Sequence, residues 1–444
     1  MVNDMDEIYK MTATQLKTKI EKRNIGIEEA TRFYLERIEK YDHKLNTISE
    51  INELALKQAR ELDSAKSRRD SILFGLPLLI KDNIDVAGLH TTAGSLALSD
   101  NLAKTNAAVV ENMIRNGGIV LGKTNMTEFA NFTAQGMPNG YSSKGGAVKN
   151  AYDSNKDPGG SSTGSAVAVS AGFCSMAVGT DTSFSIVACA TENGIVGLKP
   201  RFASLSSKGI IPISNTLDSA GALTKDLTDA ILLYNGMSDK PLAPIQPTPV
   251  KELAIGINLY NKNVVSNEQW QNYEQLFDAL RSDGARFSEI TQPYSPYQKS
   301  TMLCEFRRDL EHYLSHSSAK LKTLDDIIAY YEANPQTLMK YGISTLQEAA
   351  RMSVDDLIYK EAMAERERMR HQVLNELEKY DACIMTGPTN IMHFVGLPSL
   401  ALKLCMGEDR IPKGIIIYGA DERRLLAAAL TIETYCSPFY PPSL

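Results

Sequence analysis

The sequence predicts an α/β fold in which a large, mixed and twisted sheet is flanked by helices. Short apolar runs typical of buried strands alternate with longer segments in which apolar residues recur every three or four positions. Between residues 300 and 380 the helical pattern predominates and charges are frequent, which predicts a helical cap. A chain of 444 residues, 43% hydrophobic and 23% charged, is long and apolar enough for a large core.

We expect the whole chain, 1–444, to form one domain. The clearest break in composition is the segment 238–250, where four prolines in quick succession predict a semi-rigid connector. The expected regions are N-terminal helices (1–65), a core (70–240), the helical cap (300–380) and a C-terminal return to the core (381–444).

Two strands and several helices are expected before the centre of the chain. The segment 12–63 has helical periodicity with charged outer faces, which predicts helices that cover the core. The apolar run 71–80 ends at Lys81, a pattern typical of a buried strand that delivers one charge-capable group at its end. The segment 106–121 predicts a helix and then a strand, separated by Gly117 and Gly118.

The second half of the chain repeats this alternation. Residues 226–236 predict a helix capped by Asp226, and residues 270–284 and 423–435 predict two more. Strands are expected at 195–198, 210–213, 253–259, 382–385 and 414–418.

The composition also limits the partners and the location. The formal net charge of −6 implies no strongly basic face, so we expect no nucleic-acid partner. No apolar run is long enough for a membrane span, and the acidic N-terminus lacks a secretory signal, so the cytoplasm is the expected location. The cysteines lack paired spacing, which predicts free thiols: Cys174, Cys189, Cys304, Cys383, Cys405 and Cys436.

Two loops of small residues dominate the centre of the chain, at 157–166 and 179–187. Glycines and hydroxyl side chains crowd both loops, which suggests that backbone N–H groups approach a ligand there. The apolar run 166–172 between them predicts a buried helix or strand. A plain surface loop is the alternative for either loop alone, but a lysine at an upstream strand end argues against it for the pair.

Five motifs in a fixed order resemble those of the amidase signature family, and the flanking residues look most like its peptide amidase branch. The motifs are 75–83 (GLPLLIKDN), 122–130 (GKTNMTEFA), 159–162 (GGSS), 179–182 (GTDT) and 194–200 (GIVGLKP). The resemblance implies the family's sheet-and-helix fold and an amide hydrolase that needs no cofactor or metal. Its expected substrate is a peptide amide or a small aryl or aliphatic amide.

The same resemblance implies three catalytic residues. Ser185 aligns with the nucleophile that forms the acyl-enzyme, and Lys81 aligns with the base. Burial must lower the pKa of Lys81 for it to accept a proton at neutral pH. Ser161 aligns with the serine that passes protons between them, and its peptide bond to Gly160 is cis in the family. On chemistry alone the adjacent Ser162 could take that place.

The resemblance also implies the surroundings of the reaction. Backbone N–H groups of Thr182, Ser183, Phe184 and Ser185 would form the oxyanion hole. Asp181 is expected to hold this loop by accepting N–H bonds. The residues that line the acyl pocket would be Asn131, Phe132 and Thr133.

This chain departs from the family pattern at two positions beside the nucleophile. Ser183-Phe184 stands where the family usually has glycine or Asp-Gly, and Cys189 stands where most members have proline. We expect the Phe184 ring to fill part of the acyl pocket and to favour small or flat acyl groups. The alternative is that the ring packs backwards into the core.

Other functions compete with an amide hydrolase of this type. A Ser-His-Asp hydrolase would need a triad histidine, and none of the six histidines lies in such a stretch. A metal hydrolase would rest on His312 and His316, which lack the rest of a metal motif. An amidotransferase component of the A type that makes ammonia for a partner, or an inactive relative, is the last alternative. A monomer or a homodimer is expected.

Overall fold

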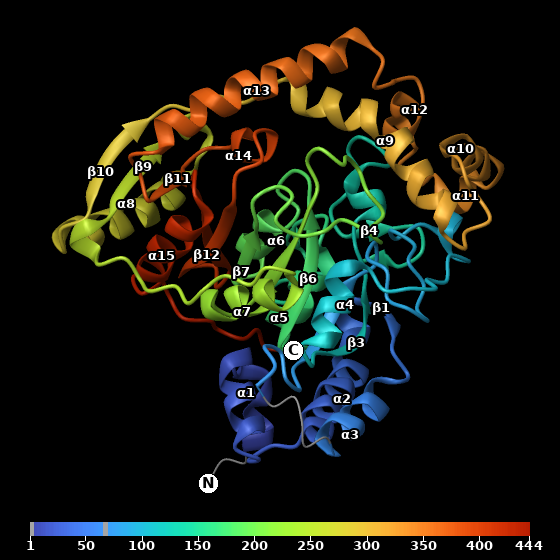
Figure 1. Cartoon of the computed structure of the whole chain (residues 1–444), viewed down its shortest axis with the longest axis horizontal. Helices are drawn as coiled ribbons and strands as arrows, with labels where there is room; N and C mark the ends of the chain where they lie inside the picture. The colour runs from blue at the N-terminus through green and yellow to red at the C-terminus, as the bar shows by residue number, and fades with distance from the viewer. Residues whose placement is uncertain (1–3, 65–69) are drawn as a thin grey trace.

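The central feature is one sheet of eleven strands, seen in a computed structural model that describes residues 4–64 and 70–444 (Figure 1). The strand order is β1-β3-β2-β6-β8-β7-β12-β13-β11-β9-β10, and β4 (Tyr141–Ser142) pairs separately with β5 (Gly146–Ala147). The strands of the large sheet are β1 (Ile48–Ile51), β2 (Pro77–Lys81), β3 (Ile119–Thr124), β6 (Met176–Asp181), β7 (Val196–Lys199), β8 (Ser219–Thr224), β9 (Ala254–Asn258), β10 (Arg286–Ile290), β11 (Ala382–Met385), β12 (Ser399–Met406) and β13 (Pro412–Tyr418).

The pairing makes the sheet mixed, as predicted. Strand β2 runs parallel to both of its neighbours, β3 and β6. Strand β8 is antiparallel to β6 and to β7, and β11 is parallel to β9 but antiparallel to β13. Since β2 is fully buried between two parallel partners, its apolar residues read as a continuous run in the sequence.

Helices cover the sheet (Figure 1). Helices also precede the first strand and follow the last strand along the chain. The helix predicted at 226–236 is α7, and its Asp226 carboxylate accepts the Asp229 N–H as the expected cap. The helices outside the cap are α1 (Ala13–Glu21), α2 (Ile27–Leu45), α3 (Ala55–Ser64), α4 (Ala108–Arg115), α5 (Thr163–Ser170), α6 (Val187–Glu192), α7 (Leu227–Met237), α8 (Asn267–Ser282), α14 (Ile391–Phe394) and α15 (Glu422–Glu433).

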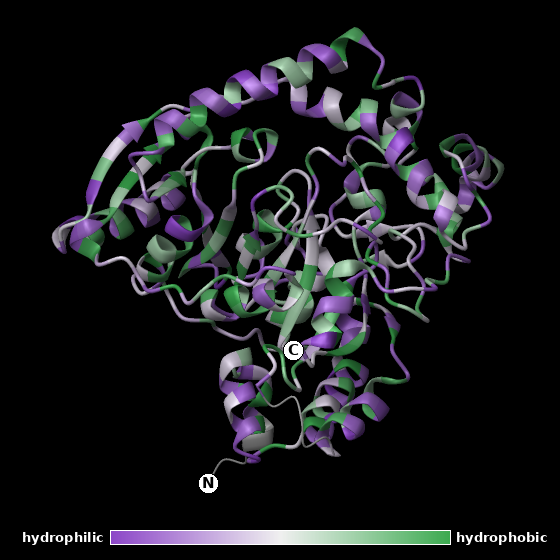
Figure 2. Ribbon diagram, viewed as in Figure 1, coloured by the Kyte–Doolittle hydropathy of each residue, from purple (hydrophilic) through white to green (hydrophobic). Residues whose placement is uncertain are grey.

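The predicted helical cap is confirmed, and it shares a second apolar core with residues from the first half of the chain. It consists of α9 (Tyr297–His316), α10 (Leu324–Ala333), α11 (Pro335–Leu338), α12 (Ser344–Ala349) and α13 (Leu357–Leu377). Figure 2 shows hydrophilic residues along much of α13, which arches over the molecule with α9. The Phe306 ring of α9 contacts the rings of Phe129 and Phe132, so the cap is joined to the segment that follows β3.

Several elements differ from the sequence predictions. Residues 48–51 lie within a stretch predicted to be helical but form the edge strand β1. The predicted strand at 210–213 is wrong, because only Ile210 makes an isolated bridge, to Ile84. Strands β6, β8, β10 and β12 were not predicted. The sequence of β8, SAGALT, is made mostly of small residues that have little β propensity, and tertiary pairing with β6 and β7 determines its structure.

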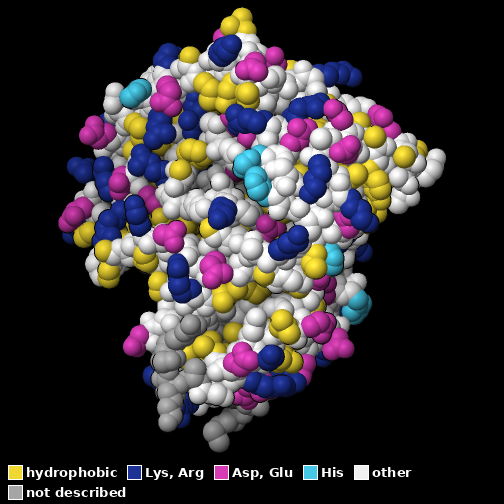
Figure 3. Space-filling view, turned by 45° about the vertical axis from the view of Figure 1, so that its right-hand side comes forward, with side chains coloured by type: hydrophobic (Ala, Val, Ile, Leu, Met, Phe, Trp, Pro, Cys, Tyr) yellow, Lys and Arg dark blue, Asp and Glu magenta, His cyan; other side chains and the backbone are white. Residues whose placement is uncertain are grey.

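Two findings concern the surface and membranes. On the face shown in Figure 3, acidic and basic side chains are interspersed, without a continuous basic surface. Over residues 4–64 and 70–444, no helix has both the length and the apolar character needed to cross a membrane.

Candidate active site

Lys81 lies at the end of β2 with none of its surface exposed. Its Nζ donates to Ser161 Oγ at 2.8 Å, Ser162 Oγ at 2.9 Å and Thr180 Oγ1 at 2.8 Å, and it lies 3.2 Å from the Thr180 carbonyl oxygen. The last residues of β2 are buried leucines and isoleucine, so the lysine has no route to bulk water along the strand. The strand therefore places one amine among three hydroxyls.

Burial lowers the pKa of Lys81 to about 7. Desolvation penalises the ammonium form, and the nearby side chains of Cys189, Asp181 and Asp218 oppose that effect only in part. Near neutral pH a substantial fraction of Lys81 is therefore the free amine, which can accept a proton.

Ser161 and Ser162 differ in how their hydroxyls are used. The Ser162 Oγ donates to the Thr180 carbonyl at 2.9 Å and accepts the Thr180 N–H at 3.2 Å, besides its bond from Lys81. The Ser161 Oγ has Lys81 as its only hydrogen-bond partner within the described residues. The bond between Gly160 and Ser161 is cis, as the family resemblance implied. Ser161 is thus the hydroxyl with capacity to exchange a proton.

Ser185 lies on the turn between β6 and α6 and is 6% exposed. Its carbonyl accepts the Ser162 N–H at 3.2 Å, which ties the two central loops together. In the part of the chain that is described, its Oγ has no hydrogen-bond partner, so the link from Ser185 to Ser161 is not closed in this structure. The N–H groups of Ser183, Phe184 and Ser185 likewise have no acceptor among described residues and are available to an oxyanion.

Asp181 holds the turn that carries Ser185. Its Oδ2 accepts the Ile186 N–H at 2.7 Å and lies 3.4 Å from the Val187 nitrogen, as expected for a structural carboxylate. Its other oxygen, Oδ1, lies 3.2 Å from Nδ1 of His393 in α14, and both side chains are buried. Burial lowers the pKa of His393, so the imidazole is neutral at pH 7.

Sequence reasoning missed His393, whose ring lies against Phe184. The two ring centroids are 4.4 Å apart with the planes at 62°. The Phe184 ring is partly buried and packs against the main core and against the His393 ring, which favours the alternative that the ring packs backwards over the expectation that it fills the acyl pocket. Phe184 nevertheless has φ of +69°, the left-handed region where glycine is favoured. His393 makes no hydrogen bond to Ser185 in the described structure, so the two do not form a Ser-His pair.

The three residues predicted to line the acyl pocket differ in how far they are buried. Phe132 is 5% exposed and its ring packs 4.9 Å from that of Phe306, within the core of the cap. Thr133 is also buried, and its Oγ1 donates to the Glu128 carbonyl at 3.1 Å. Only Asn131 of the three is exposed. Phe129, Ala130 and Asn131 have consecutive positive φ values of 45°, 55° and 70° and form a left-handed turn.

Two further features that the sequence singled out, Cys189 and the pair His312 and His316, do not form a functional site among the described residues. Burial raises the pKa of Cys189 to about 12, so its thiol stays protonated in α6. The rings of His312 and His316 lie tilted at 59° with centroids 5.0 Å apart on α9. Within residues 4–64 and 70–444, no cluster of three or more His, Cys, Asp or Glu side chains is placed to hold a metal ion.

Comparisons with known proteins agree with this fold and show the family of the chain. The family model described as Amidase matches residues 29–395. The A subunit of the glutamyl-tRNA(Gln) amidotransferase of Thermoanaerobacter pseudethanolicus is 29% identical over 96% of this chain and 96% of that protein. An amidase family protein from Bacillus anthracis superposes with a TM-score of 0.91 at 29% identity, covering 99% of this chain and 94% of that chain. The peptide amidase of Stenotrophomonas maltophilia gives 0.89 at 29% identity, over 98% of both chains.

Replacing Phe184 tests where its ring lies. We expect Phe184→Ala to lower the free energy of unfolding by about 2 kcal/mol, since a half-buried ring is lost. Phe184→Gly should be more stable than Phe184→Ala by about 1 kcal/mol, because glycine alone tolerates the positive φ. Urea titration of the three proteins measures both differences. A glycine variant of unchanged stability and widened substrate range would show instead that the ring occupies the substrate pocket.

Proposed function

Because this chain belongs to the amidase family and is an amide-hydrolysing enzyme, we propose that Ser185, Ser161 and Lys81 carry out its reaction. The observation that supports the assignment most strongly is the buried Lys81 amine, 2.8 Å from the Ser161 hydroxyl. A buried lysine of lowered pKa beside a hydroxyl that has no other partner among the described residues is a base with a proton donor in place.

The proposed reaction has two stages. Ser185 Oγ attacks the carbonyl carbon of the amide while its proton passes to Ser161, whose own proton passes to neutral Lys81. The backbone N–H groups of Thr182, Ser183, Phe184 and Ser185 stabilise the negative charge on the carbonyl oxygen. The proton returns through Ser161 to the leaving nitrogen, the C–N bond breaks, and water then hydrolyses the acyl-enzyme on Ser185.

Ser162 has a structural part in this proposal. Its hydroxyl joins Lys81 to both backbone groups of Thr180 and so fixes the amine beside β6. A Cβ at Gly179 would lie 2.7 Å from Ser162 Oγ, so glycine is required for the close approach of this hydroxyl to the strand. The Ser162 hydroxyl bonds to Thr180 as well as to Lys81, whereas the Ser161 hydroxyl has only Lys81 as a partner among the described residues. This difference supports Ser161 as the proton relay.

The proposed substrate is the carboxamide of a peptide amide or of a small aryl or aliphatic amide. The proposed state of the enzyme is a monomer or a homodimer. The resemblance in structure to a peptide amidase supports the peptide amide. The resemblance in sequence to the A subunit of an amidotransferase, at the same identity, keeps a second candidate: a component that releases ammonia for a partner protein. We also place the protein in the cytoplasm, for which six free cysteines, four of them buried, are the support.

Single substitutions test the three assigned roles. Lys81→Ala, Ser161→Ala and Ser185→Ala should each reduce kcat by about 10³-fold or more, and double substitutions should add little, because the three act as one unit. Ser162→Ala is the matched control, and its kcat should fall much less than that of Ser161→Ala. Steady-state ammonia release measures kcat, and circular dichroism confirms folding. The reverse order of the two serine variants would move the relay to Ser162.

The pH dependence tests the base. Since the protonated form of Lys81 cannot accept a proton, kcat/KM should rise about tenfold per pH unit below 7 and level off above it. The fluorescence of Trp270 over the same range serves to show that the protein stays folded. A rate that is flat from pH 5.5 to 8.5 in folded protein would contradict an amine base of this pKa.

A substrate screen separates the two candidate functions. The purified chain alone should release ammonia from C-terminal peptide amides or small amides without any added protein. Activity that appears only with a second protein, or a second protein that co-purifies in fixed ratio from the native source, would favour the amidotransferase alternative.

A further inference from the structure

A small cavity lies behind the hydroxyl that holds Lys81. Its polar lining is formed by Asn83, Thr180, Thr182, Ser207, Asp218 and Ser219, and apolar residues that include Ile211 form the rest. Its free volume of about 20 Å³ admits one water molecule, since a water needs roughly 10–15 Å³ measured in this way.

Two buried oxygens in the wall have no hydrogen-bond partner among the described residues. They are Oδ1 of Asn83, a residue 3% exposed, and Oγ of Ser219, a residue 8% exposed. The Asn83 amide nitrogen is already fixed, because it donates to Thr180 Oγ1 at 3.1 Å and to the Ile211 carbonyl at 3.2 Å. An unpaired buried oxygen is unfavourable by about 1–3 kcal/mol, so two of them around one cavity point to a polar occupant.

Thr180 supplies the third contact that such an occupant needs. Its Oγ1 accepts hydrogen bonds from Lys81 and from Asn83, and its own hydrogen has no acceptor in the described structure. A water in the cavity can accept that hydrogen and donate to Asn83 Oδ1 and Ser219 Oγ. Three hydrogen bonds are typical of a buried water.

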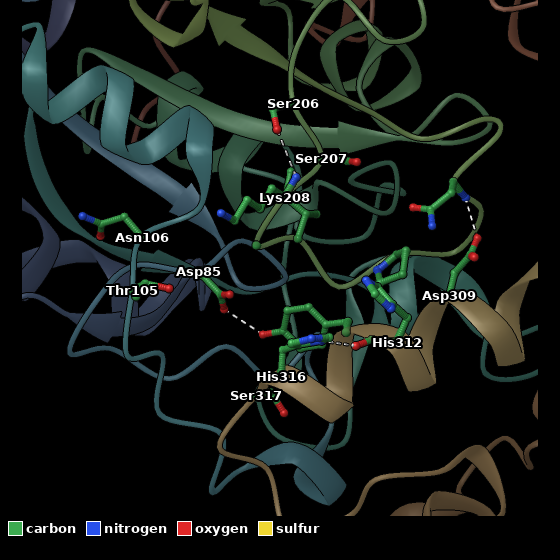
Figure 4. A pocket seen from close by; sticks show the side chains of 15 residues that line it. Asp85, Thr105, Asn106, Ser206, Ser207, Lys208, Asp309, His312, His316 and Ser317 are labelled. Carbon is green, nitrogen blue, oxygen red and sulfur yellow. Dashed lines mark hydrogen bonds between the residues drawn. The ribbon is translucent and has the colours of Figure 1, made fainter.

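The cavity lies next to an open groove on the surface. It shares Ser207, Ile210 and Pro212 with a larger open groove of about 620 Å³. Figure 4 shows this groove, with Ser207 and Lys208 on one wall and His312 and His316 of α9 on the other. The two spaces are therefore neighbours, separated by the segment that carries Ser207, Ile210 and Pro212.

We infer that this cavity binds the water that hydrolyses the acyl-enzyme, held by Asn83, Ser219 and Thr180. The inference rests on the acyl-enzyme of the proposed function. The water oxygen adds to the ester carbonyl carbon, and its proton passes through Ser161 to neutral Lys81. The bond from that carbon to Ser185 Oγ breaks, the proton returns to Oγ, and the carboxylic acid leaves. A water bonded to Thr180 Oγ1 is one hydrogen bond from the atom to which Lys81 also donates.

Filling the cavity tests the inference. Ser219→Val puts methyl groups in place of the hydroxyl, and the reaction of a p-nitrophenyl ester separates the two stages by stopped flow. The burst of nitrophenol, which reports acylation, should keep its rate within about twofold, while the steady-state rate, which reports deacylation, should fall about tenfold or more. Ser219→Ala removes the hydroxyl but leaves room for water, so its deacylation rate should lie between those of the wild type and the valine variant.

Ser399 offers a matched control. It is a fully buried serine of β12 whose Oγ also lacks a partner among the described residues, but it does not line the cavity. Ser399→Val should leave both rates within about twofold of the wild type.

The outcomes distinguish this inference from the proposed function. A wild-type protein that forms no covalent adduct on Ser185 would overturn the proposed function. A normal burst combined with unchanged deacylation in Ser219→Val would overturn the inference alone. If the valine variant does not fold, a high-resolution crystal structure of the wild type decides: an ordered water bonded to Asn83 and Ser219 supports the inference, and an empty cavity contradicts it.

Discussion

The desolvation of one amine is the constraint on which the rest of the site depends. Lys81 is fully buried, so its Nζ must find all of its hydrogen-bond partners within the protein. Three hydroxyls and one carbonyl meet that requirement, and they come from both central loops. The same burial that demands these partners also lowers the pKa of Lys81 to about 7, which gives the amine its proposed role as a base. Stability and chemistry thus follow from one feature of β2.

Much of the fold could be predicted where the local sequence agrees with the final structure. The apolar run before Lys81 forms the buried strand β2, the helix after Asp226 starts at its cap, and residues 382–385 return as β11. The proximity of Lys81 to Ser161 could not be derived from spacing, since 80 positions separate them in the sequence. Only the resemblance of the motifs predicted it. The resemblance selected Ser161 over Ser162, and the two hydrogen bonds between Ser162 and Thr180 add support to that proposal.

The features that sequence reasoning missed are those decided by distant contacts. His393 lies far along the chain from Phe184 and Asp181, and no local pattern marks a histidine that fills the space beside a left-handed phenylalanine. Strand β8 consists of small residues that gain their structure from pairing with β6 and β7. The unpaired oxygens of Asn83 and Ser219 likewise become visible only when a cavity brings them together.

The most direct test of the central claim is to locate the covalent adduct formed with a fluorophosphonate. Peptide mapping by mass spectrometry should find one adduct, on Ser185, formed faster at pH 8 than at pH 6 because neutral Lys81 accepts the proton of the attacking hydroxyl. Lys81→Ala should form it at least about a hundredfold more slowly. An adduct on another residue, or labelling of Ser185 at an unchanged rate without Lys81, would contradict the account.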